Sequence, residues 1–149
     1  MRALVQRVHN ASVSPKGHST RTINKGLCIF IGISITDEEK EIKSIVDKIV
    51  NLRIFPGKEN NERFHLSVKD IEGELLIVSQ FTLYASTNKG KRPSFTAAAK
   101  PDIASKIFFR IVEEFTNSGL KVETGIFGSD MDVEINNYGP MTLIIDSKT

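Results

Sequence analysis

The sequence predicts an α+β fold in which two helices cover a largely antiparallel sheet. Its 149 residues are typical of one domain, so we expect a single domain spanning residues 1–149. Two segments place apolar residues at helical spacing, and several short segments are rich in β-branched residues or alternate apolar with polar ones. Because no internal repeat or linker separates these segments, we expect the helices and the sheet to share one core.

The first third of the chain predicts strands. Apolar and polar residues alternate imperfectly over residues 3–13, residues 20–23 form a short second candidate, and residues 27–35 are apolar enough for a central strand. Gly17 and Gly26, each after a lysine, mark the turns between them. This order predicts that an antiparallel meander opens the fold.

A first amphipathic helix is expected after the meander. Thr36 and Glu39 have the spacing of a capping box, in which a threonine oxygen and a glutamate satisfy backbone N–H groups at a helix start. Apolar residues then recur at helical spacing over residues 42–52. The Pro-Gly pair at residues 56–57 predicts that the helix ends before it.

The second half of the chain predicts a buried strand, a second helix and a strand-rich end. Residues 75–78 are uniformly apolar, which favours a strand buried on both faces. Pro101 suits the first position of a helix whose apolar stripe runs to Phe115 and which the Asn-Ser-Gly run at residues 117–119 ends. Short segments with strand composition follow at residues 121–123, 132–135 and 142–145. We expect residues 136–140 to form the turn between the last two.

The single cysteine and the apolar stretches indicate the compartment. Cys28 cannot form an internal disulfide, and it lies in the apolar run Leu-Cys-Ile-Phe-Ile, where a buried strand thiol is favoured over a nucleophile. A single cysteine without a disulfide partner is typical of proteins in a reducing compartment. The longest apolar stretch, residues 27–33, is far shorter than the roughly 20 residues of a membrane span, and no signal-peptide core follows Met1. We therefore expect a cytoplasmic protein with no membrane contact.

Charge and histidine placement exclude several functional classes. The formal net charge is only +2, so we expect no global basic field of the kind that dedicated nucleic-acid binders carry. The densest basic segment contains Lys89, Lys91 and Arg92, and it is either a local contact for a polyanion or a solvated turn. The histidines are far apart, and neither a phosphate loop nor a dinucleotide fingerprint is present, so we expect no metal and no cofactor.

Two segments carry more polar or constrained residues than a plain fold needs. Ser79, Gln80 and Thr82 directly follow the buried strand, where rigid elements often hold functional loops. The alternative is that their side chains satisfy local backbone groups. No histidine or carboxylate lies beside Thr82 in the segment, so a catalytic triad would need a distant base. The second segment contains the pair Gly139-Pro140, which between two strand candidates is usually an ordinary turn.

Four motifs follow one another in a distinctive order. They are Ser-Gln-Phe-Thr-Leu at residues 79–83, Gly-Lys-Arg-Pro-Ser-Phe at residues 90–95, Thr-Gly-Ile-Phe-Gly at residues 124–128 with Met131, and Asn-Tyr-Gly-Pro-Met-Thr at residues 137–142. In this combination they resemble the D-aminoacyl-tRNA deacylases, the bacterial and eukaryotic type also called D-tyrosyl-tRNA deacylases. The opening of the chain, Gln-Arg-Val and Ala-Ser-Val within its first 13 residues, is similar to that family too. The resemblance covers essentially the whole chain.

The resemblance implies a barrel-like deacylase fold and a homodimer that hydrolyses the ester joining a D-amino acid to the terminal ribose of tRNA. Aminoacyl-tRNA is then the substrate, and the basic segment at residues 89–92 contacts the tRNA. The family also implies that the Gly139-Pro140 bond is cis and that this pair enters the partner subunit's active site. There the two carbonyls capture the substrate amino group and leave no room for an L side chain, so that glycyl-tRNA also passes. Arg7 matches an arginine that supports this arrangement, and Phe127 and Met131 match substrate-binding positions.

The same resemblance assigns catalysis to the segment that contains Ser79, Gln80, Phe81 and Thr82. An aminoacyl ester is already activated, so aligning a water molecule and binding the developing oxyanion suffice without a covalent nucleophile. We expect the backbone N–H groups around Gln80 and Phe81 to bind the oxyanion and the Thr82 hydroxyl to orient the motif or the substrate. The family implies that the neighbouring ribose 2′-hydroxyl promotes the attack.

Three residues depart from the family's usual pattern. Tyr138 stands where aspartate is usual, Met141 where valine is usual, and Ser129 where alanine is common. The intact Ser-Gln-Phe-Thr segment favours the strictly D-selective branch of the family. The alternative interpretation is a non-catalytic module that binds the end of tRNA on the same scaffold, and turnover of aminoacyl-tRNA separates the two.

Overall fold

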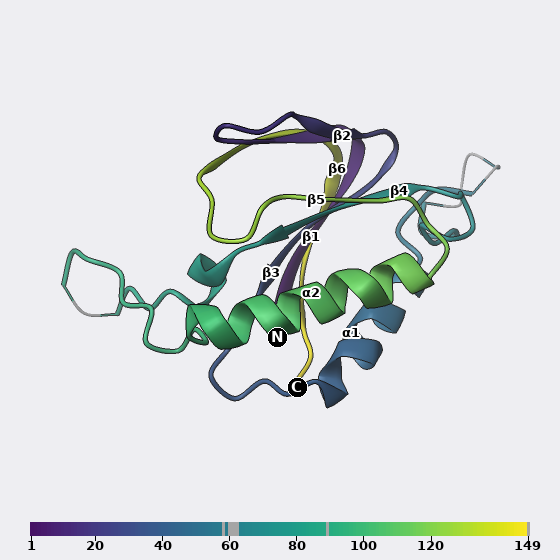
Figure 1. The fold of residues 1–149 in the computed structure, drawn as a ribbon. Coiled ribbons are helices and arrows are strands. Elements are labelled where there is room, and N and C mark those ends of the chain that lie inside the picture. The colour runs from purple at the N-terminus through teal and green to yellow at the C-terminus, as the bar shows by residue number, and fades with distance from the viewer. Residues whose placement is uncertain (58, 60–62, 89, 149) are drawn as a thin grey trace.

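Two long antiparallel strands, β1 (Arg2–Pro15) and β6 (Met131–Asp146), run through the middle of the fold. The computed structural model describes residues 1–57, 59, 63–88 and 90–148 (Figure 1). β1 and β6 pair along their whole length, from Arg2 opposite Asp146 to Pro15 opposite Met131. These two strands join the first residues of the chain to the last, and the other strands are added to the opposite edge of β1.

The remaining strands make the sheet a mixed one. β2 (Arg21–Ile23) and β3 (Gly26–Gly32) both pair antiparallel with β1, and they follow one register, since Ala11 faces Ile23 and Val8 faces Gly26. β4 (Glu74–Ser79) is parallel to β3, and β5 (Val122–Thr124) is parallel to β4. The expected meander at the N-terminus is therefore confirmed, whereas the far edge of the sheet is parallel.

Two helices cover one face of this sheet. α1 (Lys40–Asn51) and α2 (Pro101–Asn117) lie side by side on it (Figure 1), and α2 begins with the proline that the sequence predicted at its first position. Gly119, with φ +84°, follows α2 in the left-handed conformation that commonly ends a helix. The predicted α+β class with two main helices is confirmed.

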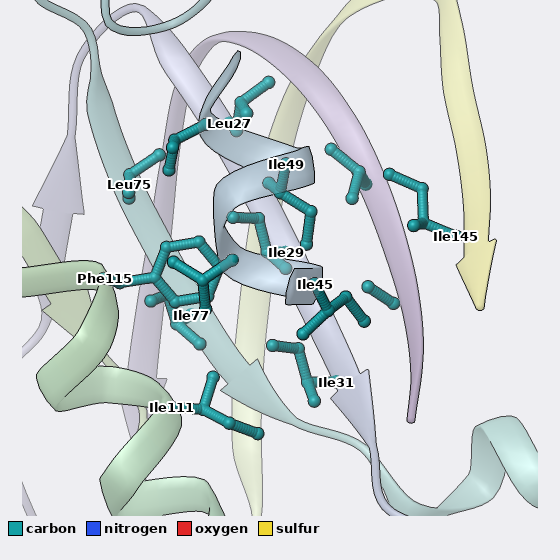
Figure 2. Packing of buried hydrophobic residues seen from close by; sticks show 14 of the residues in the cluster. Leu27, Ile29, Ile31, Ile45, Ile49, Leu75, Ile77, Ile111, Phe115 and Ile145 are labelled. Carbon is teal, nitrogen blue, oxygen red and sulfur yellow. The ribbon is translucent and has the colours of Figure 1, made fainter. Parts of the chain in front are cut away.

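The sheet has a hydrophobic core on each face. Alternate residues of β4 point to opposite sides, so Leu75 and Ile77 pack under the helices, while Leu76 and Val78 enter a second cluster. Figure 2 shows the first cluster, where Ile45 and Ile49 of α1 and Ile111 and Phe115 of α2 meet the sheet. The uniformly apolar run at residues 75–78 is thus a strand buried on both faces, as predicted.

The second core indicates how strongly the sheet curves. It brings Val78 of β4 together with Val133 and Ile135 of β6, although β1 and β3 separate these two strands in the sheet order. Side chains from such distant strands meet only if the sheet curls over them. The sheet is therefore a nearly closed, barrel-like one, and its curled side encloses the apolar residues of the second core.

The predicted capping box is wrong. α1 begins at Lys40 with Glu39 as its cap residue, and no side chain caps it. Asp37, whose side chain is 1% exposed, instead accepts a hydrogen bond from the Ser34 N–H at 2.7 Å, which holds residues 34–37 in a turn before the helix. The Glu41 carboxylate reaches back to the Glu38 N–H at 2.7 Å. Thr36 is therefore one turn too early to cap this helix.

The predicted turn at residues 136–140 is also wrong. These residues belong to β6, which continues without a reversal from Met131 to Asp146. The two predicted strands at residues 132–135 and 142–145 are the two halves of this one strand. β1 is long enough to pair with both halves, so the chain does not need to turn back between them.

The apolar face of α2 provides a matched test of the core. Phe115 is fully buried, whereas Phe109 on the same helix is 63% exposed. We predict that Phe115→Ala lowers the free energy of unfolding by about 3–5 kcal/mol, because it removes buried apolar surface and leaves a cavity. Phe109→Ala, which has the same change in helix propensity, should alter it by about 0.5 kcal/mol or less. Urea denaturation of both variants measures the difference, and equal losses would contradict this packing.

Candidate active site

The Ser-Gln-Phe-Thr segment lies at the end of β4. Ser79 is the last residue of the strand, and a short 3-10 helix, η1 (Phe81–Tyr84), follows Gln80. The end of β3 lies close against this turn, since a Cβ on Gly32 would come within 3.0 Å of the Gln80 carbonyl oxygen. A glycine at residue 32 therefore lets the turn pack against the sheet, which is a positioning role that the sequence analysis did not find.

The backbone donors of this segment are not equivalent. The Gln80 N–H donates to the Ile31 carbonyl at 2.8 Å, so it belongs to the sheet edge and is not available for an oxyanion. This corrects the expectation for Gln80. Phe81 is the first residue of η1, and the first N–H groups of a helix have no carbonyl acceptor within that helix. Of the two expected donors, Phe81 is the one whose position leaves it available.

The Thr82 hydroxyl is held by its neighbour. The Gln80 side-chain amide donates to Thr82 Oγ1 at 2.5 Å, and both side chains reach the surface. An amide N–H is a donor and no base, so this bond cannot take the hydroxyl proton and cannot turn Thr82 into a nucleophile. It leaves that proton free to be donated to another group. The geometry is that of an orienting hydroxyl.

A pocket of about 620 Å³ opens beside this segment. Ser79, Gln80 and Phe81 line one side of it, and Phe127 and Met131 line another. The structure thus brings five of the predicted site residues together around one cavity, while Thr82 follows directly in the chain without lining it. The pocket also has lining residues that the sequence analysis did not assign to it, among them Phe95, Ala98, Ala99, Lys100, Ala104 and Asp130.

Local contacts hold the far wall of the pocket. The Phe127 ring packs against Phe108 of α2 with the ring centres 5.9 Å apart. The Met131 sulfur accepts the Ile126 N–H at 3.3 Å, and a Cβ on Gly125 would come within 2.5 Å of that sulfur. The glycine before the Ile-Phe-Gly run therefore makes room for the methionine in the pocket wall.

The basic loop is joined to the pocket by an aromatic contact. Ser86 and Ser94 exchange two backbone hydrogen bonds, of 2.8 and 2.9 Å, that close the loop at its base. Lys91 and Arg92 are exposed in this loop, which projects past the start of α2 (Figure 1). Lys89 lies outside the described residues. Directly after the base of the loop, the Phe95 ring packs edge-on against Phe81 at 5.0 Å.

The Gly139-Pro140 pair lies in a bulge of β6. Gln6 of β1 pairs with Thr142 and Val8 pairs with Asn137, so the four residues 138–141 face the single residue Arg7. The extra residues cannot enter the ladder, and they are displaced from it. The Gly139-Pro140 peptide bond is cis, as the resemblance implied.

Arg7 fastens this bulge from the opposite strand. Its side chain is buried, and its guanidinium donates to the carbonyls of Tyr138 at 3.0 Å, of Gly139 at 3.3 Å, and of Ile54. The Asn137 amide donates to the carbonyls of Arg7 at 2.9 Å and Met141 at 3.1 Å, which ties the two ends of the bulge together. Burial lowers the pKa of the Arg7 guanidinium from its ordinary value.

One chain does not bring the bulge to the pocket. Arg7 faces Leu27 near the start of β3, whereas Ser79 faces Ile31 near its end. Neither Arg7 nor the Gly139-Pro140 pair lines the pocket. Within a single chain, the two segments that the sequence singled out are therefore separate features.

Comparisons with known proteins decide the family. A family model described as D-Tyr-tRNA(Tyr) deacylase matches residues 4–146. The D-aminoacyl-tRNA deacylases of Aquifex aeolicus and Thermosipho africanus are 50% and 49% identical over 148 residues, which is 99% of this chain and 99% and 98% of theirs. The chain belongs to the D-Tyr-tRNA(Tyr) deacylase family. Because its members are hydrolases, the chain is an enzyme of that class.

Solved structures agree with this deacylase fold. A c-Myc DNA unwinding element binding protein superposes with a TM-score of 0.91 at 37% identity, over 100% of both chains. A probable eukaryotic D-amino acid tRNA deacylase superposes with a TM-score of 0.85 over 97% of each chain, and at 15% identity it shares the fold alone. This chain therefore shares its two-helix, barrel-like fold with both of these structures.

Metal-ligating groups, apolar helices and the single cysteine bear on other kinds of site in this deacylase. Across the described ranges, three or more His, Cys, Asp or Glu side chains do not gather anywhere as metal ligands would. Neither α1 nor α2 combines the length and the apolar composition that a helix needs to cross a membrane. The interpretation of Cys28 as a strand thiol is confirmed, because it is fully buried and burial raises its pKa from 9.0 to about 12.

The Cys28 thiol gives a test of this burial. Because burial raises the pKa of this thiol to about 12, the folded protein carries almost no reactive thiolate at pH 8, so we predict no labelling by iodoacetamide in native protein and full labelling in urea. An unfolded thiol ionises near its ordinary value of 9.0 while the folded one stays neutral, so stability should fall as the pH rises above 9.0. Mass spectrometry follows the labelling, and rapid modification of native protein would contradict the packing of β3.

Proposed function

We propose that this chain hydrolyses the ester bond of D-aminoacyl-tRNA and releases free D-amino acid and tRNA in the cytoplasm. The observation that carries the proposal is the pocket beside Ser79, Gln80 and Phe81, in a chain that matches deacylases over nearly its whole length. Its volume of about 620 Å³ lies within the usual range of small-ligand sites, so it has room for a terminal nucleoside with its amino acid.

The reaction needs little from the protein beyond orientation and charge stabilisation. A water molecule attacks the ester carbonyl carbon, the bond to the ribose oxygen breaks, and the proton of the water passes to that oxygen. The Phe81 N–H binds the developing oxyanion, and the Thr82 hydroxyl orients the substrate. The neighbouring ribose 2′-hydroxyl assists the attack, so no protein nucleophile is required.

Selection against L-amino acids is assigned to the β6 bulge. The carbonyls of Gly139 and Pro140 take the substrate ammonium group and leave no space for an L side chain, so that D-aminoacyl and glycyl esters pass. Arg7 supports this assignment because it holds the bulge by its carbonyls. The proposed selective wall is thus made of backbone atoms, which no substitution removes.

The active unit is proposed to be a homodimer. The bulge and the pocket are separate within one chain, so a second copy has to supply the Gly139-Pro140 pair to the pocket formed by Ser79–Phe81, Phe127 and Met131. Each copy gives its bulge to the other, as an isologous two-fold interface allows. The site is then incomplete without the partner.

The basic loop is proposed to bind the tRNA backbone. Lys91 and Arg92, which follow Lys89 in the sequence, are exposed. The contact between Phe95 and Phe81 connects the base of their loop to the proposed catalytic segment. Phosphate contacts of this kind position a nucleic acid without reading its sequence. The net charge of +2 supplies no strong global attraction, so a contact with the tRNA backbone has to be local.

A non-catalytic role in binding nucleic acid is the second candidate. A structural relative that is 37% identical is a DNA unwinding element binding protein by name, which favours such a role for this scaffold. A binding module would shift tRNA in a gel and release no amino acid. Turnover of charged tRNA therefore separates it from the deacylase.

The proposed reaction predicts strong chiral selectivity. D-tyrosyl-tRNA should be hydrolysed at least ~100-fold faster than L-tyrosyl-tRNA, which corresponds to about 2.7 kcal/mol of transition-state stabilisation. The measurement is release of labelled tyrosine from both substrates, with each corrected for spontaneous hydrolysis. Equal rates of hydrolysis for the D and L substrates would contradict D-selectivity. Binding of tRNA without release of tyrosine would favour the binding module.

The basic loop predicts a change in salt dependence. Replacing Lys89, Lys91 and Arg92 with alanine should weaken tRNA binding and reduce the slope of log affinity against log salt by about 2, because fewer counterions are released. The matched control replaces Lys43, Lys48 and Lys106 with alanine. These substitutions remove the same charge from exposed positions on α1 and α2. Equal slopes for the two triple variants would indicate that the loop is a solvated turn and does not contact the tRNA.

A further inference from the structure

Two flat side chains sandwich the ring of Tyr138. The Arg7 Cζ atom lies over this ring at 4.0 Å from its centre. The His9 ring is stacked on it at 4.3 Å, with 18° between the two planes. Two groups at these distances cannot share one face of a six-membered ring, so Arg7 and His9 lie on opposite faces.

The buried Arg7 has carbonyl acceptors where a carboxylate would be expected. None of the ion pairs formed by the described residues includes it. A buried charge is costly unless it is paired, and the negative face of an aromatic ring attracts a cation most strongly where water is excluded. The Tyr138 ring therefore offsets part of the cost of burying the Arg7 charge without a carboxylate partner.

Tyr138 contacts the guanidinium in two ways. The Arg7 Cζ atom lies over its ring, while its carbonyl accepts from the guanidinium Nε–H at 3.0 Å. The same guanidinium donates to the Gly139 carbonyl at 3.3 Å. Because the donors of a guanidinium lie in one plane, a ring that fixes the plane also fixes the direction in which Arg7 meets the Gly139 carbonyl.

We propose that Tyr138 is a positioning residue for chiral selection: its ring, backed by His9, holds Arg7 in the plane that orients the Gly139 carbonyl. This inference rests on the proposed role of that carbonyl in recognising the substrate ammonium group. Tyr138 touches no reacting atom, and it acts through Arg7. The phenol oxygen has no part in the proposal, since only the ring face is used.

The test compares two substitutions at residue 138. Tyr138→Phe keeps the ring, whereas Tyr138→Leu replaces it with an apolar side chain that has no π face. We expect Tyr138→Phe to retain the ratio of kcat/KM for D-tyrosyl-tRNA over L-tyrosyl-tRNA within about twofold, and Tyr138→Leu to reduce it by about tenfold or more. His9→Ala, at an exposed position, should reduce the ratio less and should fold even if Tyr138→Leu does not.

A second readout is independent of the reaction. Solvent exchange of the Arg7 Nε–H, followed by NMR, should be slow in the starting protein and in Tyr138→Phe, and about tenfold faster in Tyr138→Leu. If the starting protein shows no D-selective hydrolysis, the proposed function fails while the exchange rates still test the stack. An unchanged selectivity ratio and slow exchange in Tyr138→Leu would overturn the inference. Equal effects of Tyr138→Phe and Tyr138→Leu would overturn it too, because the ring face would then not be the cause.

Discussion

The β1–β6 ladder matches four residues of one strand against a single residue of the other, and the candidate site depends on that mismatch. Residues 138–141 cannot be accommodated opposite Arg7, so their backbone leaves the sheet with carbonyls that do not belong to the ladder. Backbone carbonyls need partners when they leave a sheet, and Arg7 supplies them for Tyr138 and Gly139. The bulge is therefore a built feature, with a buried cation at its base.

The rest of the fold supports the pocket in the same way, through elements that have little freedom to move. β4 is buried on both faces, so the position of Ser79 at its end is determined by two cores at once. The Gln80 N–H is used to continue the sheet, and Gly32 lets η1 lie against it. The Ser-Gln-Phe-Thr segment is thus a continuation of a strand that is buried on both faces, and the separate bulge is the part that a partner subunit is proposed to receive.

Local pattern predicted the elements whose residues determine their own structure. The apolar run of β4, the proline that starts α2 and the glycine after its end were all found, because each signal lies within the element itself. The continuous β6 was missed because its pairing partner, β1, lies at the other end of the chain, and a Gly-Pro step has the local chemistry of a turn. The use of the Gln80 N–H by Ile31 was invisible for the same reason, since it depends on which strand lies beside β4. The stacking partners of Tyr138 became visible only once the register between β1 and β6 was known.

The most direct test of this account is a crystal structure of the protein with an amide-linked, non-hydrolysable analogue of D-tyrosyl-adenosine. The account predicts the adenosine in the pocket beside Phe81, with the tyrosyl ammonium group within about 2.7–3.2 Å of the Gly139 and Pro140 carbonyls of a second copy. An ammonium group held by residues of the pocket's own chain, with the bulges of both copies away from it, would contradict the central claim that the β6 bulge selects the substrate.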